Sequence, residues 1–200
     1  MDSPKIPKSL PKYLSLDESK ALLSGIDGKD KLRDYAIITL FLNCGMRLSE
    51  LAGINVRDIK DDKLTVIGKG NKERVIYLNA ACTKAVEAYI KNERPTEGIK
   101  HPHQNALFIS RNKQRLSIKT IQHLVKKHLH AAGLDDTKYS VHKLRHTAAT
   151  LMYRHGHVDV RVLQEILGHT NLATTQIYTH LDSEQLRSAA DRNPLADLDD

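Results

Sequence analysis

The stretch KLTVIGKGNKERVIYLN, residues 63–79, decides the fold class, because here the hydrophobic pattern changes from a helical period to a strand period. Leu64, Val66 and Ile67 precede a polar, glycine-rich turn, GKGN, and apolar residues resume after that turn. A turn of this composition between two short apolar runs is typical of an antiparallel β-hairpin.

Helical patterns lie on both sides of this hairpin. Before it, a capping box of Ser15 and Glu18 predicts the start of one helix, a second is predicted over residues 30–44 with an end near Gly45, and a short one begins near Ser49. After it, one short strand is predicted over 106–112, and helices are predicted over 81–94, 117–133, 140–156, 159–168, 171–181 and 182–191. The expected fold is mainly α with a small antiparallel β-sheet, an α+β class.

The amino-acid composition limits the classes of function that the protein can have. The 200 residues are 40% apolar, enough for one compact domain, and no run approaches the ~18 apolar residues of a membrane span. The first residues contain no apolar signal core, so we expect a cytoplasmic protein without a membrane partner. Cys44 and Cys82 form no C-x-x-C pair, which argues against zinc, and a disulfide is not expected. The net charge of +7 favours a polyanionic partner.

The predicted helix over 140–156 carries His142 and Arg145 three residues apart, on one helix face. Its apolar residues lie on the opposite face, so this pair is expected to point away from the core or into a cleft. Arginine offers a rigid fork of donors for phosphate oxygens, and histidine can move a proton near neutral pH. The simpler alternative is a solvated face. His142 and His146 have the spacing of a metal pair, but the glutamate of H-E-x-x-H is missing, so we expect no metal.

Two more groups of basic residues precede this helix. Arg47 directly follows the end of the helix over 30–44, and Glu50, three residues on, can pair with it. Lys69 and Lys72 lie on the hairpin turn, from which a lysine can reach into a neighbouring groove. A local ion pair and two exposed turn lysines are the simpler interpretations.

Tyr178 follows His169 by nine residues in LGHTNLATTQIYTH, which ends at His180. Ionising an ordinary tyrosine, with its pKa of ~10, costs about 4 kcal/mol at pH 7. A unit cation ~4 Å away offsets about 4 kcal/mol at an effective dielectric near 20. Two arginines and a lysine can therefore activate the phenol as a nucleophile for phosphoryl transfer, without a metal. The alternative is an ordinary half-buried aromatic residue.

Four motifs together resemble the tyrosine recombinases, also called phage-type integrases: CGMRLSELAGI, VIGKGNKERVIYL, VHKLRHTAATLM and LGHTNLATTQIYTH. The resemblance covers nearly all of residues 8–190, and GKGNKER is most similar to the Xer branch, which resolves chromosome dimers. It implies the catalytic-domain fold of that family and site-specific DNA recombination through a 3′-phosphotyrosyl intermediate, with no cofactor. A type IB topoisomerase and a non-catalytic DNA-binding protein of the same fold are the alternatives.

The resemblance also implies roles for the residues singled out above. Arg47 and Arg145 would clamp the scissile phosphate while Tyr178 attacks it. Lys69 would protonate the departing 5′-hydroxyl, and Lys72 is the second candidate for this task. All four basic residues would contact DNA.

Three further roles follow from the resemblance. His142 would be the acid–base partner of the tyrosine, and His169 would hydrogen-bond a nonbridging oxygen. Glu50 would brace Arg47 and is also a candidate brace for the hairpin. The implied partners are double-stranded DNA and further recombinase protomers in a tetrameric complex, with a monomer expected in the absence of DNA.

The expected domain organisation has three parts. Residues 1–13 are proline-rich and basic, and they are interpreted as a linker or arm. Residues 14–190 are expected to form the catalytic domain, and 191–200 an acidic tail. The N-terminal core-binding domain that usually precedes this catalytic domain in the family is expected to be absent. The helix over 182–191 is expected to fold back on its own domain in an isolated monomer.

Overall fold

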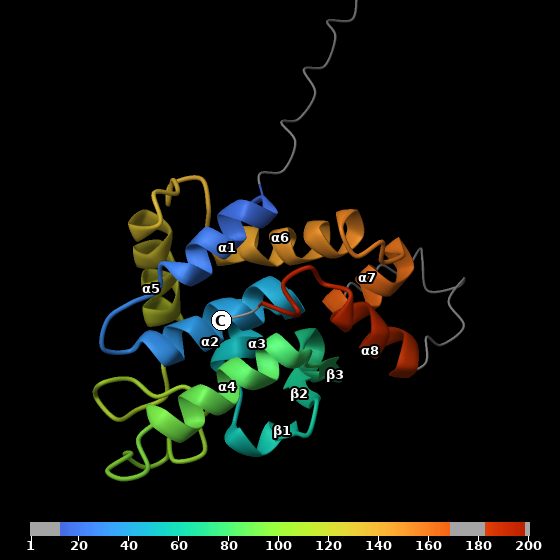
Figure 1. Ribbon diagram of the computed structural model, residues 1–200. Coiled ribbons are helices and arrows are strands. Elements are labelled where there is room, and N and C mark those ends of the chain that lie inside the picture. The colour runs from blue at the N-terminus through green and yellow to red at the C-terminus, as the bar shows by residue number, and fades with distance from the viewer. Residues whose placement is uncertain (1–12, 169–182, 199–200) are drawn as a thin grey trace, which may run out of the picture.

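The computed structural model describes residues 13–168 and 183–198, and Figure 1 shows their arrangement. The predicted His169 and Tyr178, and the helix expected over 171–181, lie outside these residues. The elements within the described residues are, in chain order, α1 (Leu16–Ser24), α2 (Lys31–Cys44), α3 (Leu48–Ala52), a 3₁₀ turn (Val56–Asp58), β1 (Ile59–Lys60), β2 (Lys63–Ile67), a 3₁₀ turn (Lys69–Asn71), β3 (Glu73–Tyr77), α4 (Ala80–Asn92), α5 (Ile118–Ala131), α6 (Val141–Arg154), α7 (Val160–Leu167) and α8 (Ser183–Asp191).

Local capping chemistry explains where several helices begin. Ser15 accepts a hydrogen bond from the backbone N–H of Glu18 at 3.1 Å, and the Glu18 carboxylate accepts one from the N–H of Ser15 at 2.8 Å. The predicted capping box is therefore confirmed. Ser117 and Asp159 likewise cap α5 and α7 with their side chains. Ser140 occupies the predicted N-cap position of α6 but forms no side-chain cap hydrogen bond.

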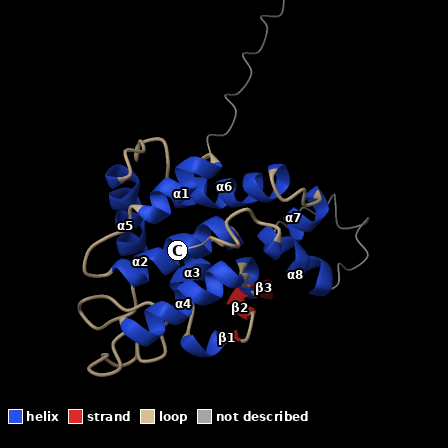
Figure 2. Ribbon diagram, viewed as in Figure 1, coloured by secondary structure: helices blue, strands red, loops and turns tan. Residues whose placement is uncertain are grey.

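The sheet has the strand order β1-β2-β3 and is antiparallel throughout, with Leu64 opposite Ile76 and Val66 opposite Arg74. The predicted hairpin is confirmed as β2 and β3. The two-residue strand β1 was not predicted, because it is too short to show an alternating pattern. Figure 2 shows the strands as a small patch at one edge of a helical body.

The strand expected over 106–112 is wrong. This segment forms only isolated bridges, Asn55 with Ala106 and Ile109 with Arg115. Three of its carbonyls accept hydrogen bonds from arginine side chains instead of a neighbouring strand: Arg94 binds the Ala106 and Leu107 oxygens, and Arg33 binds the Ile109 oxygen. Because side chains satisfy these backbone groups, the segment can be buried without a ladder.

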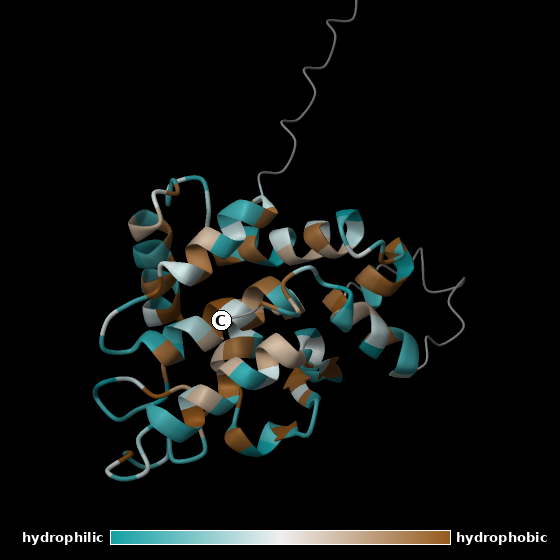
Figure 3. Ribbon diagram, viewed as in Figure 1, coloured by the Kyte–Doolittle hydropathy of each residue, from teal (hydrophilic) through white to brown (hydrophobic). Residues whose placement is uncertain are grey.

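The core is centred on α2, which has buried residues on all sides and packs against α4 and α6. Hydrophilic residues cover the outward turns of α1 and α8 (Figure 3). The free thiols of Cys44 and Cys82 meet inside the core with their sulfur atoms 3.7 Å apart, and the Cys44 contact and burial together raise the pKa of Cys82. Among the described helices, none has the length and apolar character needed to cross a membrane.

The C-terminal helix α8 packs on the same chain, against α7 and β3, as expected for an isolated monomer. The Arg187 guanidinium donates to the Asp62 carboxylate at 2.7 Å and lies over the ring of Tyr77. The residues that follow α8 also pack on the domain, because Leu195 and Ala196 are buried. Apolar side chains hold the 192–198 segment on the domain despite its acidic neighbours.

Candidate functional site

Arg47 lies at the corner between α2 and α3. Gly45 ends α2 in the left-handed conformation, with φ of 60°, and Arg47 then occupies the N-cap position of α3. Glu50 accepts a hydrogen bond from the Arg47 backbone N–H at 2.8 Å and from its guanidinium at 3.3 Å. The predicted pairing of Arg47 with Glu50 is confirmed.

Glu50 has a second arginine partner, whose guanidinium lies closer to it than that of Arg47 and which the sequence analysis missed. Arg74 on β3 donates from Nε to Glu50 Oε1 at 3.1 Å and from its terminal nitrogen to Oε2 at 2.9 Å. Burial alone would raise the pKa of Glu50, but the Arg74 hydrogen bonds, the Arg47 N–H and the two positive charges outweigh it and lower the pKa. Glu50 is therefore an anion fixed between α3 and the hairpin.

Arg145 approaches from α6 and is buried, with 7% of its surface exposed. Its guanidinium donates to the carbonyls of Gly45 at 2.5 Å and Leu167 at 2.6 Å. Burial and the charge of Arg47 lower the pKa of Arg145 to about 10, so it remains a cation at neutral pH. The contacts exclude the solvated-face alternative for Arg145 and leave the cleft interpretation.

Three arginines converge on the carboxyl end of α7. Arg74 donates to the Ile166 carbonyl, Arg145 to Leu167, and Arg47 to Gly168 at 3.4 Å. The last carbonyls of a helix lack partners within the helix and carry partial negative charge, which explains why guanidinium groups gather there. Arg47, Arg74 and Arg145, called here the arginine cluster, have one carboxylate among them, Glu50, which pairs with Arg47 and Arg74 and leaves a net charge of +2. Such a site favours an anion.

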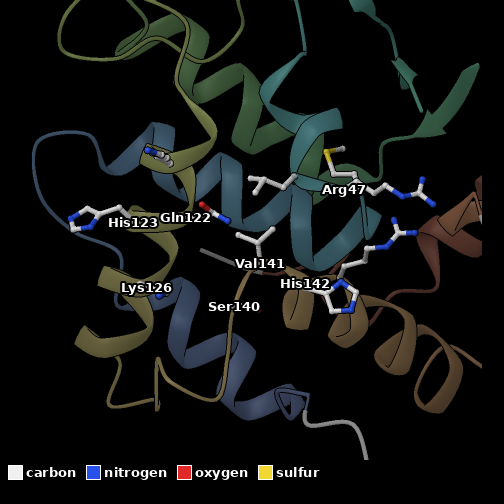
Figure 4. Close-up of a pocket in the computed structure, with 11 residues that line it drawn as sticks. Arg47, Gln122, His123, Lys126, Ser140, Val141 and His142 are labelled. Carbon is white, nitrogen blue, oxygen red and sulfur yellow. The ribbon is translucent and has the colours of Figure 1, made fainter. Parts of the chain in front are cut away.

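Two members of the arginine cluster, Arg47 and Arg145, border an open cavity of about 730 Å³. Arg47, His142 and Arg145 line one side, and Figure 4 shows Arg47 and His142 with residues of α5 across the cavity. The α5 side presents polar and basic residues at the spacing of a single helix face, namely Lys119, Gln122, His123 and Lys126. A helix over 117–133 was predicted from the sequence, but the polar face of that helix was not connected with the site.

The hairpin lysines are not held in the site. Lys69 and Lys72 are exposed on the turn between β2 and β3, and neither side chain forms a hydrogen bond or ion pair with another described residue. The base of their turn does lie against the site, because a Cβ on Gly68 would be 3.4 Å from Glu50 Oε1. His169 follows directly after Gly168 in the sequence, but it and Tyr178 fall outside the described ranges.

Among the described residues, His142 and His146 belong to no group of three or more metal-ligating side chains. His146 lies edge-on to the ring of Tyr13, and burial and the charges of Lys143 and His142 lower the pKa of His146. Within residues 13–168 and 183–198, no three or more His, Cys, Asp or Glu side chains are grouped as a metal site requires.

The chain is similar to known proteins along nearly its whole length. The model of the phage integrase family matches residues 12–185. A tyrosine recombinase XerC from Caldanaerobacter subterraneus subsp. tengcongensis is 63% identical over 196 residues, which are 98% of this chain and 55% of that protein. The chain therefore spans little more than half the length of that relative.

Solved structures agree with this comparison. A crystal structure of XerA recombinase has a TM-score of 0.69 and 33% identity, over 90% of this chain and 64% of the other. The structure of XerH recombinase bound to its difH substrate before cleavage also has a TM-score of 0.69, at 29% identity, over 94% of this chain and 56% of the other. The mainly helical fold with one small sheet is the fold of these recombinases.

Proposed function

The chain belongs to the phage integrase family, and from this premise we propose that it is the catalytic part of a site-specific DNA recombinase. The proposed reaction breaks one strand of a duplex, holds the 3′ end covalently on Tyr178, and rejoins it to a new 5′-hydroxyl. The matched relatives are named as recombinases, which favours this reaction over the topoisomerase alternative.

One observation supports the proposal above the others. Arg47, at the corner before α3, and Arg145, on α6, are 98 residues apart in sequence, yet they place their guanidinium groups at the same carboxyl end of α7 and line the same cavity. Two arginine forks around one position are suited to the two nonbridging oxygens of a phosphodiester. An arginine that only stabilised the fold would not need to border an open cavity, as both of these arginines do.

The proposed chemistry proceeds in two balanced steps. The Tyr178 phenolate oxygen attacks the phosphorus while the bond to the 5′ oxygen breaks, and Lys69 gives that oxygen a proton. His142 takes the proton of the phenol before attack. In the second step a 5′-hydroxyl attacks the phosphotyrosine, the bond to the tyrosine oxygen breaks, and the protons return. Because each phosphodiester is exchanged for another, no external energy source is needed.

The arginines act mainly in the transition state. A five-coordinate phosphorus carries more negative charge on its oxygens than the starting diester, so fixed cations bind it more strongly. Arg145 uses part of its five N–H donors on the Gly45 and Leu167 carbonyls, and the others remain for an anion. His169 is proposed to donate to a nonbridging oxygen from beyond the end of α7.

The duplex is proposed to lie along the cavity, over α5. Lys119 and Lys126 supply positive charge for the backbone, and Gln122 lies between them on the same face as a donor and acceptor for base edges. Further protomers, gathered by binding the same DNA, are proposed to complete the exchange of strands.

A covalent capture experiment tests the function. The protein is mixed with a pool of nicked duplexes whose bases around the nick are randomised, so that cleavage next to the nick releases a short fragment and traps the adduct. We expect a covalent adduct that resists detergent, and its sequenced DNA gives the target site. Tyr178→Phe should abolish the adduct, while Tyr153→Phe, at a tyrosine exposed on α6, should not. An adduct formed by Tyr178→Phe, or none formed by the unaltered protein, would contradict the proposal.

A further inference from the structure

We propose that Arg74 is a positioning residue of this site, which fixes Glu50 so that Glu50 in turn orients Arg47 toward the phosphate. The inference rests on the proposed function, because it assigns Arg74 a task in DNA cleavage. It concerns a residue of the hairpin that neither touches the open cavity nor belongs to the set expected from the sequence.

The contacts of Glu50 show which arginine fixes it. The Arg74 guanidinium binds both carboxylate oxygens, at 2.9 and 3.1 Å, whereas the Arg47 guanidinium reaches only one of them, at 3.3 Å, and Arg47 holds the other through its backbone N–H at 2.8 Å. The Glu50 side chain is completely buried, so it has no contact with solvent while both arginines are in place. With Arg74 removed, the carboxylate would turn toward the remaining cation, and Arg47 would follow it away from the cavity.

The place of Arg74 separates positioning from direct contact with DNA. Arg47 and Arg145 line the large open cavity, but Arg74 lines a different cavity of about 240 Å³ between β3 and the α7–α8 region. Its side chain is 16% exposed, against 31% for Arg47. Arg74 forms the shortest ion pair of the arginine cluster, with Glu50, and it lies away from the proposed phosphate.

Arg74 also connects three segments that must be in register for the proposed reaction. It lies on β3 opposite Val66, three residues from the turn that carries Lys69, and it donates to the Ile166 carbonyl of α7. The end of α7 packs closely on it, since a Cβ on Gly168 would be 3.2 Å from both Cδ and Nε of Arg74. One guanidinium thus joins the hairpin, the base of α3 and the end of α7.

The shape of the guanidinium is essential to this task. Its planar fork donates to two carboxylate oxygens and one carbonyl at once, in fixed directions. A lysine has the same charge but cannot reproduce the fork. Arg74→Lys should therefore restore the charge without restoring the geometry, which distinguishes positioning from a general need for positive charge.

The first test measures cleavage of the nicked duplex pool by variants at matched folded concentration. We expect Arg74→Ala to slow adduct formation by about 10- to 100-fold, as for partners that orient metal ligands, and Arg74→Lys to remain at least about threefold slower than the unaltered protein. In the Arg47→Ala background, Arg74→Ala should have little further effect, because its target is already absent. Losses that multiply in the double variant would overturn the proposal.

The matched control is Arg94→Ala. Arg94 is also half-buried and also donates to backbone carbonyls, of Gln104, Ala106 and Leu107, but it lies outside the site. It should lower the melting temperature without slowing cleavage per folded molecule. The affinity of Arg74→Ala for a random duplex should depend on salt concentration as it does for the unaltered protein. Loss of one phosphate contact would instead change the slope of log affinity against log salt concentration by about 0.9. Such a change in slope for Arg74→Ala would overturn the positioning role. DNA cleavage by Arg94→Ala that is as slow as cleavage by Arg74→Ala would also overturn it.

A measurement without DNA distinguishes failure of this inference from failure of the proposed function. In ¹⁵N–¹H spectra, the Arg47 Nε–Hε signal is identified by its loss in Arg47→Ala. We expect Arg74→Ala and Arg74→Lys to shift this signal toward that of a free arginine, and Arg94→Ala to leave it in place. An unmoved signal in both Arg74 variants would refute the inference even if the protein cleaves DNA. A moved signal with no cleavage by the unaltered protein would refute only the recombinase assignment.

Discussion

Replacing Gly45 by alanine tests how closely α2, α6 and α7 must approach to build the site. Gly45 has φ of 60°, and a Cβ there would lie 2.7 Å from the Leu167 side chain and 3.5 Å from that of Ala148. Leu167 is buried, so its methyl group cannot turn into solvent. Gly133 supplies the control, because it has φ of 73° and nothing within 4 Å of an added Cβ.

The magnitude follows from the difference between the two sites. Forcing alanine into the left-handed region costs about 1–2 kcal/mol, and the stiffer unfolded chain returns about 0.4–1 kcal/mol. Gly133→Ala should therefore destabilise the protein by about 1 kcal/mol. Gly45→Ala adds the cost of overpacking, about 1–3 kcal/mol, for a total of about 2–4 kcal/mol.

Urea denaturation, with linear extrapolation to water, measures both free energies of unfolding. Gly45→Ala should also reduce covalent capture of DNA, because the carbonyls of Gly45 and Leu167 both hold Arg145. Gly133→Ala, at the end of α5, should leave capture per folded molecule unchanged. Equal destabilisation of the two variants would refute the reasoning, since it would mean that α7 does not pack against Gly45 as closely as described.

Three other predictions concern single side chains. Arg145→Ala should abolish cleavage with only a modest loss of DNA affinity in a gel-shift assay, because the clamp is stronger in the transition state, and equal losses in both assays would contradict it. Because the pKa of Glu50 is lowered from 4.5 in the folded protein, its ionised carboxylate stabilises the fold above pH 4.5, and this stabilisation is lost as the pH falls through the lowered pKa. The difference in the free energy of unfolding between the unaltered protein and Glu50→Gln should therefore shrink below about pH 4.5. A difference that grows on acidification would contradict this prediction. Thr147→Val should cost about 1–3 kcal/mol in urea denaturation, since it leaves the buried Leu14 N–H without its acceptor, and should cost more than Thr150→Val, which removes only a bond within α6.

Helix boundaries and the hairpin could be predicted from the sequence because they depend on neighbours along the chain. The Ser15–Glu18 capping box and the left-handed Gly45 satisfy backbone groups within four residues of themselves. The Arg47–Glu50 pair is local in the same sense. Even so, the strand predicted over 106–112 does not form, because carbonyls of this segment bind arginine side chains from other parts of the chain.

The assembly of the site was decided only by tertiary structure. Arg145 binds the carbonyl of Gly45, 100 residues away, and Arg47 that of Gly168, 121 residues away. The resemblance of the sequence to the tyrosine recombinases implied a role for Arg145. The spacing of His142 and Arg145 alone placed Arg145 on a helix face that could equally be solvated. No pattern singled out Arg74 among the basic residues of GKGNKER, because its importance comes from Glu50 and from α7. A charged side chain is specified by its partners in space, and the cost of burying it is met only where the packed helices bring those partners within hydrogen-bond distance.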